Sequence, residues 1–127
     1  MSTTQLPVVI LGASAKPDRY ANRAQKALIN AGYTVIPVSS QGISIDGVAG
    51  VKNLTDIREK VDTVTIYVRP EILDTQLDSL LALNPRRVIF NPGTENPSAQ
   101  AALRAAGIQV LEACTLVLLS IGQFETA

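Results

Sequence analysis

The segment LPVVILGAS, residues 6–14, decides the fold of this 127-residue chain. Its first six residues form a short apolar run rich in β-branched side chains, which predicts a buried strand. Three small residues follow the run, so we expect the chain to leave the strand in a loop at that point. A loop that follows a buried first strand is also the first place to look for a ligand.

A helix is predicted directly after this loop, over residues 19–30. Apolar side chains recur there at helical spacing, at Ala24, Ala27, Leu28 and Ala31. Gly32 follows where the end of a helix favours a left-handed residue. Residues 33–38 form a second β-branched run, so the first third of the chain predicts one βαβ unit.

The rest of the chain continues this alternation. We expect strands over residues 63–68, 87–90 and 108–111, helices over residues 72–81 and 98–106, and a short helix over residues 54–61. Residues 43–51 predict an irregular excursion, and the apolar tail 114–121 fits either a helix or a strand. Alternating strands and helices favour parallel strands joined by right-handed crossovers. The predicted fold is α/β: a Rossmann-like doubly wound parallel sheet in a three-layer αβα arrangement, as one domain over residues 1–127.

The composition excludes several classes of function. Eleven basic residues balance eleven acidic ones, so no net field draws the chain to nucleic acid or to an anionic membrane. The chain has no histidine and one cysteine, which excludes zinc chemistry and nucleophilic catalysis by Ser-His or Cys-His pairs. The first five residues lack the features of a signal peptide, and the apolar runs are far shorter than the roughly 20 residues of a membrane span. These features predict a cytoplasmic protein.

Four loops at the carboxyl ends of the predicted strands are the candidate site: residues 12–20, 38–41, 67–70 and 91–96. In the first, Gly12 allows a tight turn, and Ser14 and Lys16 add a hydroxyl and a cation to a helix start that could hold a pyrophosphate. The alternative is that Gly12 only turns the chain and Ser14 caps the helix. Only the first glycine of the dinucleotide pattern Gly-x-Gly-x-x-Gly is present, and no acidic residue follows the second strand, so a nicotinamide cofactor is disfavoured.

The other candidates carry two interpretations each. Tyr67 fits either a pocket rim or the core, and residues 91–96 fit either a ligand contact or a plain turn. A basic helix face toward phosphate or a solvated face explains Arg19, Tyr20, Arg23 and Lys26. Cys114 lies among apolar neighbours, which predicts a packed core residue rather than a reactive thiol.

Taken together, the motifs resemble those of the CoA-binding domain family of small bacterial proteins. The motifs are Gly12-Ala13-Ser14, Pro17, Arg19-Tyr20-Ala21, Gly32-Tyr33, Pro37-Val38, Leu54-Thr55-Asp56-Ile57, Val61-Asp62, Asn91-Pro92-Gly93 and Cys114-Thr115-Leu116-Val117. Members of this family occur as stand-alone domains and are similar to the N-terminal domain of the succinyl-CoA synthetase alpha subunit. The resemblance implies a Rossmann-like fold and coenzyme A as the cofactor.

The resemblance also implies a role for each loop. Gly12, Ala13, Ser14, Lys16, Arg19 and Tyr20 would face the CoA diphosphate, and Val38, Ser39 and Ser40 would line the adenine and ribose side. Tyr67, Val68, Arg69 and Pro70 would border the cofactor, and Asn91, Pro92 and Gly93 would lie along the pantetheine path.

The function expected from the sequence is a binding module for coenzyme A or an acyl-CoA, without catalytic residues of its own. No histidine is present to carry phosphate and no ATP-grasp portion to supply it, so the sequence supports no enzymatic claim. Two alternatives stay open: a small NAD(P)-binding enzyme or redox sensor, and a subunit that has lost its ligand and binds a protein partner. The sequence also leaves open a protein partner or a homo-oligomer.

Overall fold

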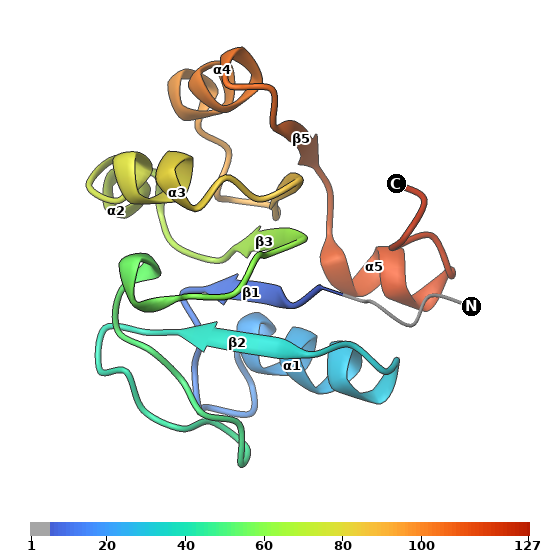
Figure 1. Ribbon diagram of the computed structural model, residues 1–127. Coiled ribbons are helices and arrows are strands. Elements are labelled where there is room, and N and C mark those ends of the chain that lie inside the picture. Colours follow the sequence, from blue (N-terminus) through green and yellow to red (C-terminus); the bar gives the residue numbers. More distant parts are fainter. Residues whose placement is uncertain (1–5) are drawn as a thin grey trace.

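The computed structural model describes residues 6–127, so the N-terminal residues on which the signal-peptide argument rests lie outside the described part. The five strands are β1 (Val8–Leu11), β2 (Val35–Val38), β3 (Thr63–Ile66), β4 (Arg87–Phe90) and β5 (Gln109–Glu112). The helices are α1 (Tyr20–Asn30), α2 (Pro70–Asp74), α3 (Leu77–Leu83), α4 (Pro97–Ala105) and α5 (Thr115–Ser120), with a 3-10 turn η1 (Leu54–Asp56). Figure 1 shows their arrangement.

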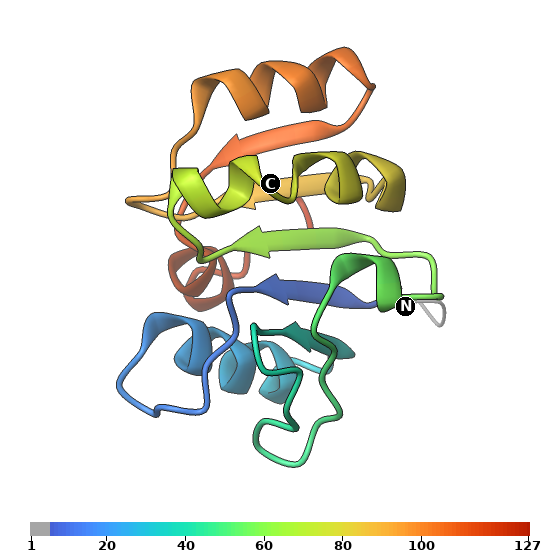
Figure 2. The same cartoon turned by 90° about the vertical axis from the view of Figure 1, so that its left-hand side faces the viewer.

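All five strands pair in parallel, in the order β2-β1-β3-β4-β5 (Figure 2). Val8 lies opposite Val35 on one side and Thr63 on the other, so β1 sits between β2 and β3. The chain moves outward from β1 to β2, then crosses back to β3. The loops after β1 and β3 therefore diverge at this reversal of strand order, which is where open α/β sheets form a crevice.

Successive strand residues face opposite sides of the sheet and build two cores. Val9 and Leu11 pack in the larger core with buried residues of η1, α2, α3 and α4. Val8 and Ile10 pack in the second core with α1 and with Phe124, beyond α5. Helices thus cover both faces (Figure 1), and the predicted three-layer parallel fold is confirmed.

The sequence-based element bounds need three corrections. The single helix predicted over residues 72–81 is wrong, because the chain breaks between α2 and α3 at Thr75 and Gln76, where the Thr75 hydroxyl donates to the Ile72 carbonyl at 2.6 Å. The helix predicted over residues 54–61 is only the short turn η1. Each strand is four residues long, so the strands predicted over residues 33–38 and 63–68 are too long. The apolar tail, for which propensity left helix and strand open, forms the helix α5.

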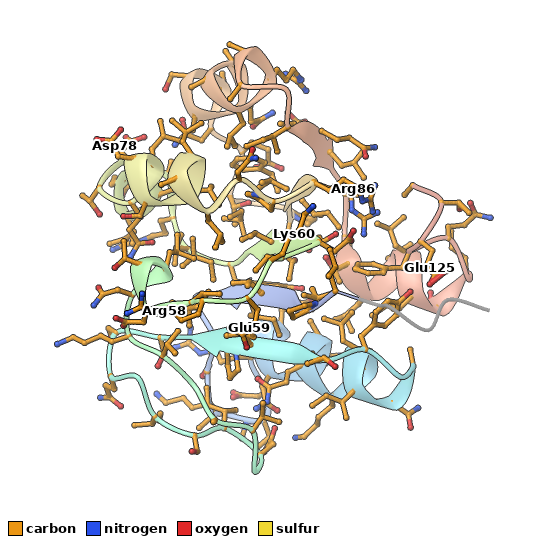
Figure 3. The ribbon with its side chains drawn as sticks, in the orientation of Figure 1. Arg58, Glu59, Lys60, Asp78, Arg86 and Glu125 are labelled. Carbon is orange, nitrogen blue, oxygen red and sulfur yellow. The ribbon has the colours of Figure 1, made fainter. Side chains whose placement is uncertain are left out.

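A buried arginine ties the C-terminal segment to the amino-terminal end of the sheet. Arg87 at the start of β4 is fully buried, and it donates to the Thr63 hydroxyl at 3.0 Å and to the Phe124 carbonyl at 2.6 Å. Its guanidinium also lies 4.6 Å from the centre of the Phe124 ring, a cation–π distance. The exposed neighbours Arg86 and Glu125 lie on this side of the molecule in Figure 3. This cluster lies at the amino-terminal ends of β3 and β4, opposite the candidate site.

Candidate functional site

The turn after β1 requires a glycine. Gly12 has φ +94°, and a Cβ built on it would lie 2.8 Å from Val68 Cγ1 and 3.0 Å from the Tyr67 carbonyl carbon. The Gly12 and Ala13 amides both donate to the Val38 carbonyl, at 3.0 and 2.9 Å. The loops that follow β1, β2 and β3 therefore pack directly against one another at this point.

The start of α1 leaves amide groups available beside this turn. Arg19 is the N-cap residue, and no side chain caps the helix. The Arg19 amide donates to the Lys16 carbonyl, but the first helical amides have no partner further back in the helix. Ser14 does not cap the helix, since its hydroxyl accepts from the Lys16 amide at 3.1 Å. The helix start can therefore bind an anion through amide groups and its positive dipole end.

Two buried side-chain amides of α1, those of Asn22 and Gln25, hold the surrounding loops in place. The Asn22 side-chain amide donates to the Ser14 carbonyl at 2.8 Å and to an Asp46 carboxylate oxygen at 3.0 Å. Gln25 donates to the Ile45 carbonyl at 2.9 Å. The irregular excursion over residues 43–51 is thus fastened to α1 and to the loop after β1. Sequence reasoning missed both residues, because a polar residue inside a helix reads as solvent-facing.

Three adjoining cavities follow the carboxyl ends of the strands. The first, about 450 Å³, lies over β1 and β2 and is lined by Leu11, Gly12, Ala13, Arg19, Val38, Ser39, Ser40, Lys52, Tyr67, Val68, Arg69, Ile72 and Gln76. The second, about 290 Å³, is lined by Gly12, Ser14, Arg19, Tyr20, Ala21, Tyr67, Val68, Arg69, Pro92, Gly93 and Thr94. The third, about 220 Å³, is lined by Tyr20, Tyr67, Asn91, Pro92, Cys114 and Leu116. Because Tyr67 lines all three, they form one groove along this edge.

The charges in this groove are all of one sign. Arg19 and Arg69 line both of the larger cavities, and Lys52 lines the first. No Asp or Glu is among the described residues that line the three cavities. The groove can therefore attract an anion locally, although the chain as a whole carries no net charge.

A hydrogen-bond network fixes the floor of the groove at β3 and β4. The Asn91 side-chain amide donates to the Thr65 hydroxyl at 2.6 Å and to the Ile66 carbonyl at 2.8 Å, while its oxygen accepts from the Thr115 amide at 2.9 Å. The Thr65 and Thr115 hydroxyls are 2.8 Å apart. Burial raises the pKa of Tyr67 to about 12, although the nearby Thr65 and Thr115 hydroxyls partly offset this, so the phenol stays neutral at physiological pH.

Fourteen of the sixteen residues singled out from the sequence line this groove. The other two lie beside it: Lys16 is exposed on the loop after β1, and Pro70 is the first residue of α2. The interpretation of Cys114 as a packed core residue is wrong, because its side chain is only partly buried and lines the third cavity. Lys52 was also missed, since only the bridge between Val51 and Val38 brings it to the groove.

No helix among the described residues has the length and apolar character to cross a membrane. Residues 6–127 hold no cluster of three or more His, Cys, Asp or Glu side chains suited to a metal ion.

A parallel sheet with a groove at its strand-order reversal and a glycine turn before an uncapped helix defines a Rossmann-like α/β domain. The chain belongs to the CoA binding domain family, whose sequence profile matches residues 7–120. The family predicted from the sequence motifs is confirmed.

Individual relatives match most of this chain in structure or in sequence. A crystal structure of an uncharacterized protein superimposes with a TM-score of 0.88 at 38% identity, covering 96% of this chain and 100% of that one. Uncharacterized protein YneT of Bacillus subtilis (strain 168) is 29% identical over 104 residues, which is 82% of this chain and 77% of YneT.

A larger protein contains the same fold as one part. The dinucleotide forming acetyl-coenzyme A synthetase 1 of Ca. Korarchaeum cryptofilum, in complex with phosphate and ADP, matches with a TM-score of 0.72 at 17% identity. The match covers 86% of this chain and 26% of the synthetase, and at this identity it shows a shared fold alone.

Proposed function

We propose that this chain is a binding module for coenzyme A or an acyl-CoA, held in the groove along the carboxyl ends of the strands. The observation that carries the proposal is the change in charge along this groove. Cationic side chains line the two larger cavities, whereas the third has no charged side chain among its lining residues. Coenzyme A has the same polarity, with an anionic nucleotide at one end and an uncharged pantetheine at the other.

The nucleotide end of the ligand fits the first cavity, the largest of the three in the groove. Val38 supplies an apolar wall at the end of β2, and the Ser39 and Ser40 hydroxyls can hydrogen-bond the ribose. Lys52 lines the same cavity and can pair with a phosphate on that ribose. The absence of an acidic residue in this lining favours a phosphorylated ribose over the free diol of NAD.

The diphosphate fits the middle cavity, where the Gly12 turn meets the start of α1. The helix start has no side-chain cap, and Arg19 and Arg69 line this cavity. Charge-assisted hydrogen bonds from two arginines can neutralise a diphosphate without any further basic residue. Pro92 and Gly93 then border the path toward the third cavity, where the pantetheine arm would run.

Titration calorimetry of the purified protein with CoA, ADP and NAD, at one salt concentration, tests the proposal. We expect CoA to bind more tightly than ADP, because only CoA carries the pantetheine arm that reaches the third cavity. Tighter binding of NAD would favour the nicotinamide alternative. No binding of any of the three at high micromolar concentration would refute the proposal and favour a domain that binds a protein partner.

A further inference from the structure

The third cavity differs from the rest of the groove in its walls. Tyr20, Tyr67, Pro92 and Leu116 give it aromatic and aliphatic surface, and Cys114 adds a thiol. Asn91 also lines it, but the network described above already uses both of its side-chain amide atoms. Most of the lining is therefore apolar, but the Tyr67 hydroxyl is buried without a hydrogen-bond partner among the described residues and can bond the amide or thioester of a ligand. The cavity thus suits a mainly apolar group that carries few polar atoms.

The position of this cavity makes it the end of the groove. It shares Tyr20, Tyr67 and Pro92 with the middle cavity, and α5 closes it on the far side through Leu116. The network on Asn91 holds the Thr115 amide at the start of α5, so this wall is fixed to the ends of β3 and β4. A ligand that runs along the groove from its nucleotide end would place its last atoms here.

Resting on the proposed function, we infer that the third cavity binds the thioester end of an acyl-CoA with a short aliphatic acyl group. A cavity of about 150 Å³ accommodates the six carbons of benzene, so a cavity of about 220 Å³ has room for roughly nine non-hydrogen atoms. The sulfur, two carbons and nitrogen at the end of pantetheine use four of these. The remaining five match a butyryl group.

A series of acyl chain lengths tests this inference on the unmodified protein. Each methylene that enters an apolar cavity contributes about 0.8 kcal/mol, which corresponds to a roughly fourfold gain in affinity. We expect butyryl-CoA to bind about fifteenfold more tightly than acetyl-CoA, with little further gain for hexanoyl-CoA and octanoyl-CoA. Equal affinities for acetyl-CoA and butyryl-CoA, with clear binding of CoA itself, would overturn the inference and leave the proposed function standing.

A pair of variants on α5 distinguishes binding in the third cavity from binding in the rest of the groove. Leu116→Trp fills the cavity, whereas Val117→Trp places the same side chain at the neighbouring position, which is 52% exposed and outside the lining. We expect Leu116→Trp to abolish the gain in affinity from acetyl-CoA to butyryl-CoA and to leave the ADP affinity unchanged. Val117→Trp should keep the same dependence of affinity on acyl chain length as the unmodified protein. Retention of the butyryl gain in Leu116→Trp would contradict the inference.

The Cys114 thiol reports occupancy of the cavity without any substitution. Alkylation by N-ethylmaleimide, followed by mass spectrometry, should slow at least about tenfold at saturating butyryl-CoA and remain unchanged at saturating ADP. Acyl-CoA thioesters carry no free thiol, so disulfide formation cannot account for the protection. Unchanged alkylation at saturating butyryl-CoA would show that the acyl end lies elsewhere. Failure of CoA itself to bind would instead refute the proposed function, and the inference with it.

Discussion

Replacing Gly12 with alanine should affect both stability and ligand binding. The positive φ of Gly12 costs an alanine about 1–2 kcal/mol. The new Cβ would also meet Val68 Cγ1 at 2.8 Å and the Tyr67 backbone at 3.0 Å, and overpacking of this kind costs about 1–3 kcal/mol more. Tyr67 cannot move away freely, because its amide donates to the Leu11 carbonyl at 2.8 Å. We expect Gly12→Ala to lower the free energy of unfolding by about 2–5 kcal/mol.

Gly32→Ala is the matched control. Gly32 has the same φ of +94°, but apart from its own chain neighbours no atom of residues 6–127 lies within 4 Å of a Cβ built on it. Gly32→Ala should lower the free energy of unfolding only by the conformational cost of positive φ, about 1–2 kcal/mol. This variant should bind CoA like the unmodified protein. Gly12→Ala should also bind CoA at least about tenfold more weakly, because Tyr67 and Val68 line the groove.

Urea denaturation and titration calorimetry on both variants measure these differences. Equal losses of stability in the two variants would refute the steric argument for Gly12. Unchanged CoA affinity in a destabilised Gly12→Ala protein would show that the turn after β1 shapes the fold but not the binding site.

The remaining predictions concern single side chains. Arg69→Ala should weaken CoA binding about tenfold and reduce its salt dependence in calorimetry, whereas Lys26→Ala, an exposed α1 residue outside the groove lining, should change neither. Arg87→Met should destabilise the fold by about 2–4 kcal/mol in urea, because the buried Phe124 carbonyl loses its donor; a loss under 0.5 kcal/mol would contradict this. Asn22→Ala should speed amide exchange in residues 43–51, and unchanged exchange would show that Asn22 does not hold this segment. Because burial raises the pKa of Tyr67 to about 12, its contribution to stability is complete below pH 10 and declines as pH rises toward 12. Tyr67→Phe should reduce the decline in stability over this range and leave the part due to Tyr33, whose pKa is also raised to about 12; an identical pH profile would contradict this.

Most of the fold could be predicted from the sequence, because four of the five strands are buried along their whole length and therefore fall in short runs dominated by β-branched and other apolar residues. Each of the five predicted strands is present, and the helix ends at Gly32 and Gly107 have the left-handed residues that the pattern indicates. The break between α2 and α3 could not be predicted, since the apolar spacing continues through it. The form of the tail could not be predicted either, because its start is held by the Asn91 network, which joins residues distant in sequence.

The candidate site was predictable where a loop directly follows a strand. Parallel strands bring their carboxyl ends to one edge, so the loops after β1, β2, β3 and β4 had to meet there. The sequence did not predict Lys52 and Leu116 as site residues, because neither lies in one of those four loops. The apolar neighbours of Cys114 in the sequence predict a core residue. They do not show that the start of α5 turns this side chain toward a cavity.

The sequence by itself determined the parallel α/β fold, the family and the loops that surround the groove. Those features depend on local patterns: apolar runs, glycine at positive φ, and the alternation of strand and helix. Only the tertiary structure decided how charge is distributed along the groove. Three cationic side chains line it toward one end, and an apolar cavity lies against α5 at the other. The physical reason is that this distribution arises from side chains far apart in the chain, which only strand pairing and the buried polar network bring together.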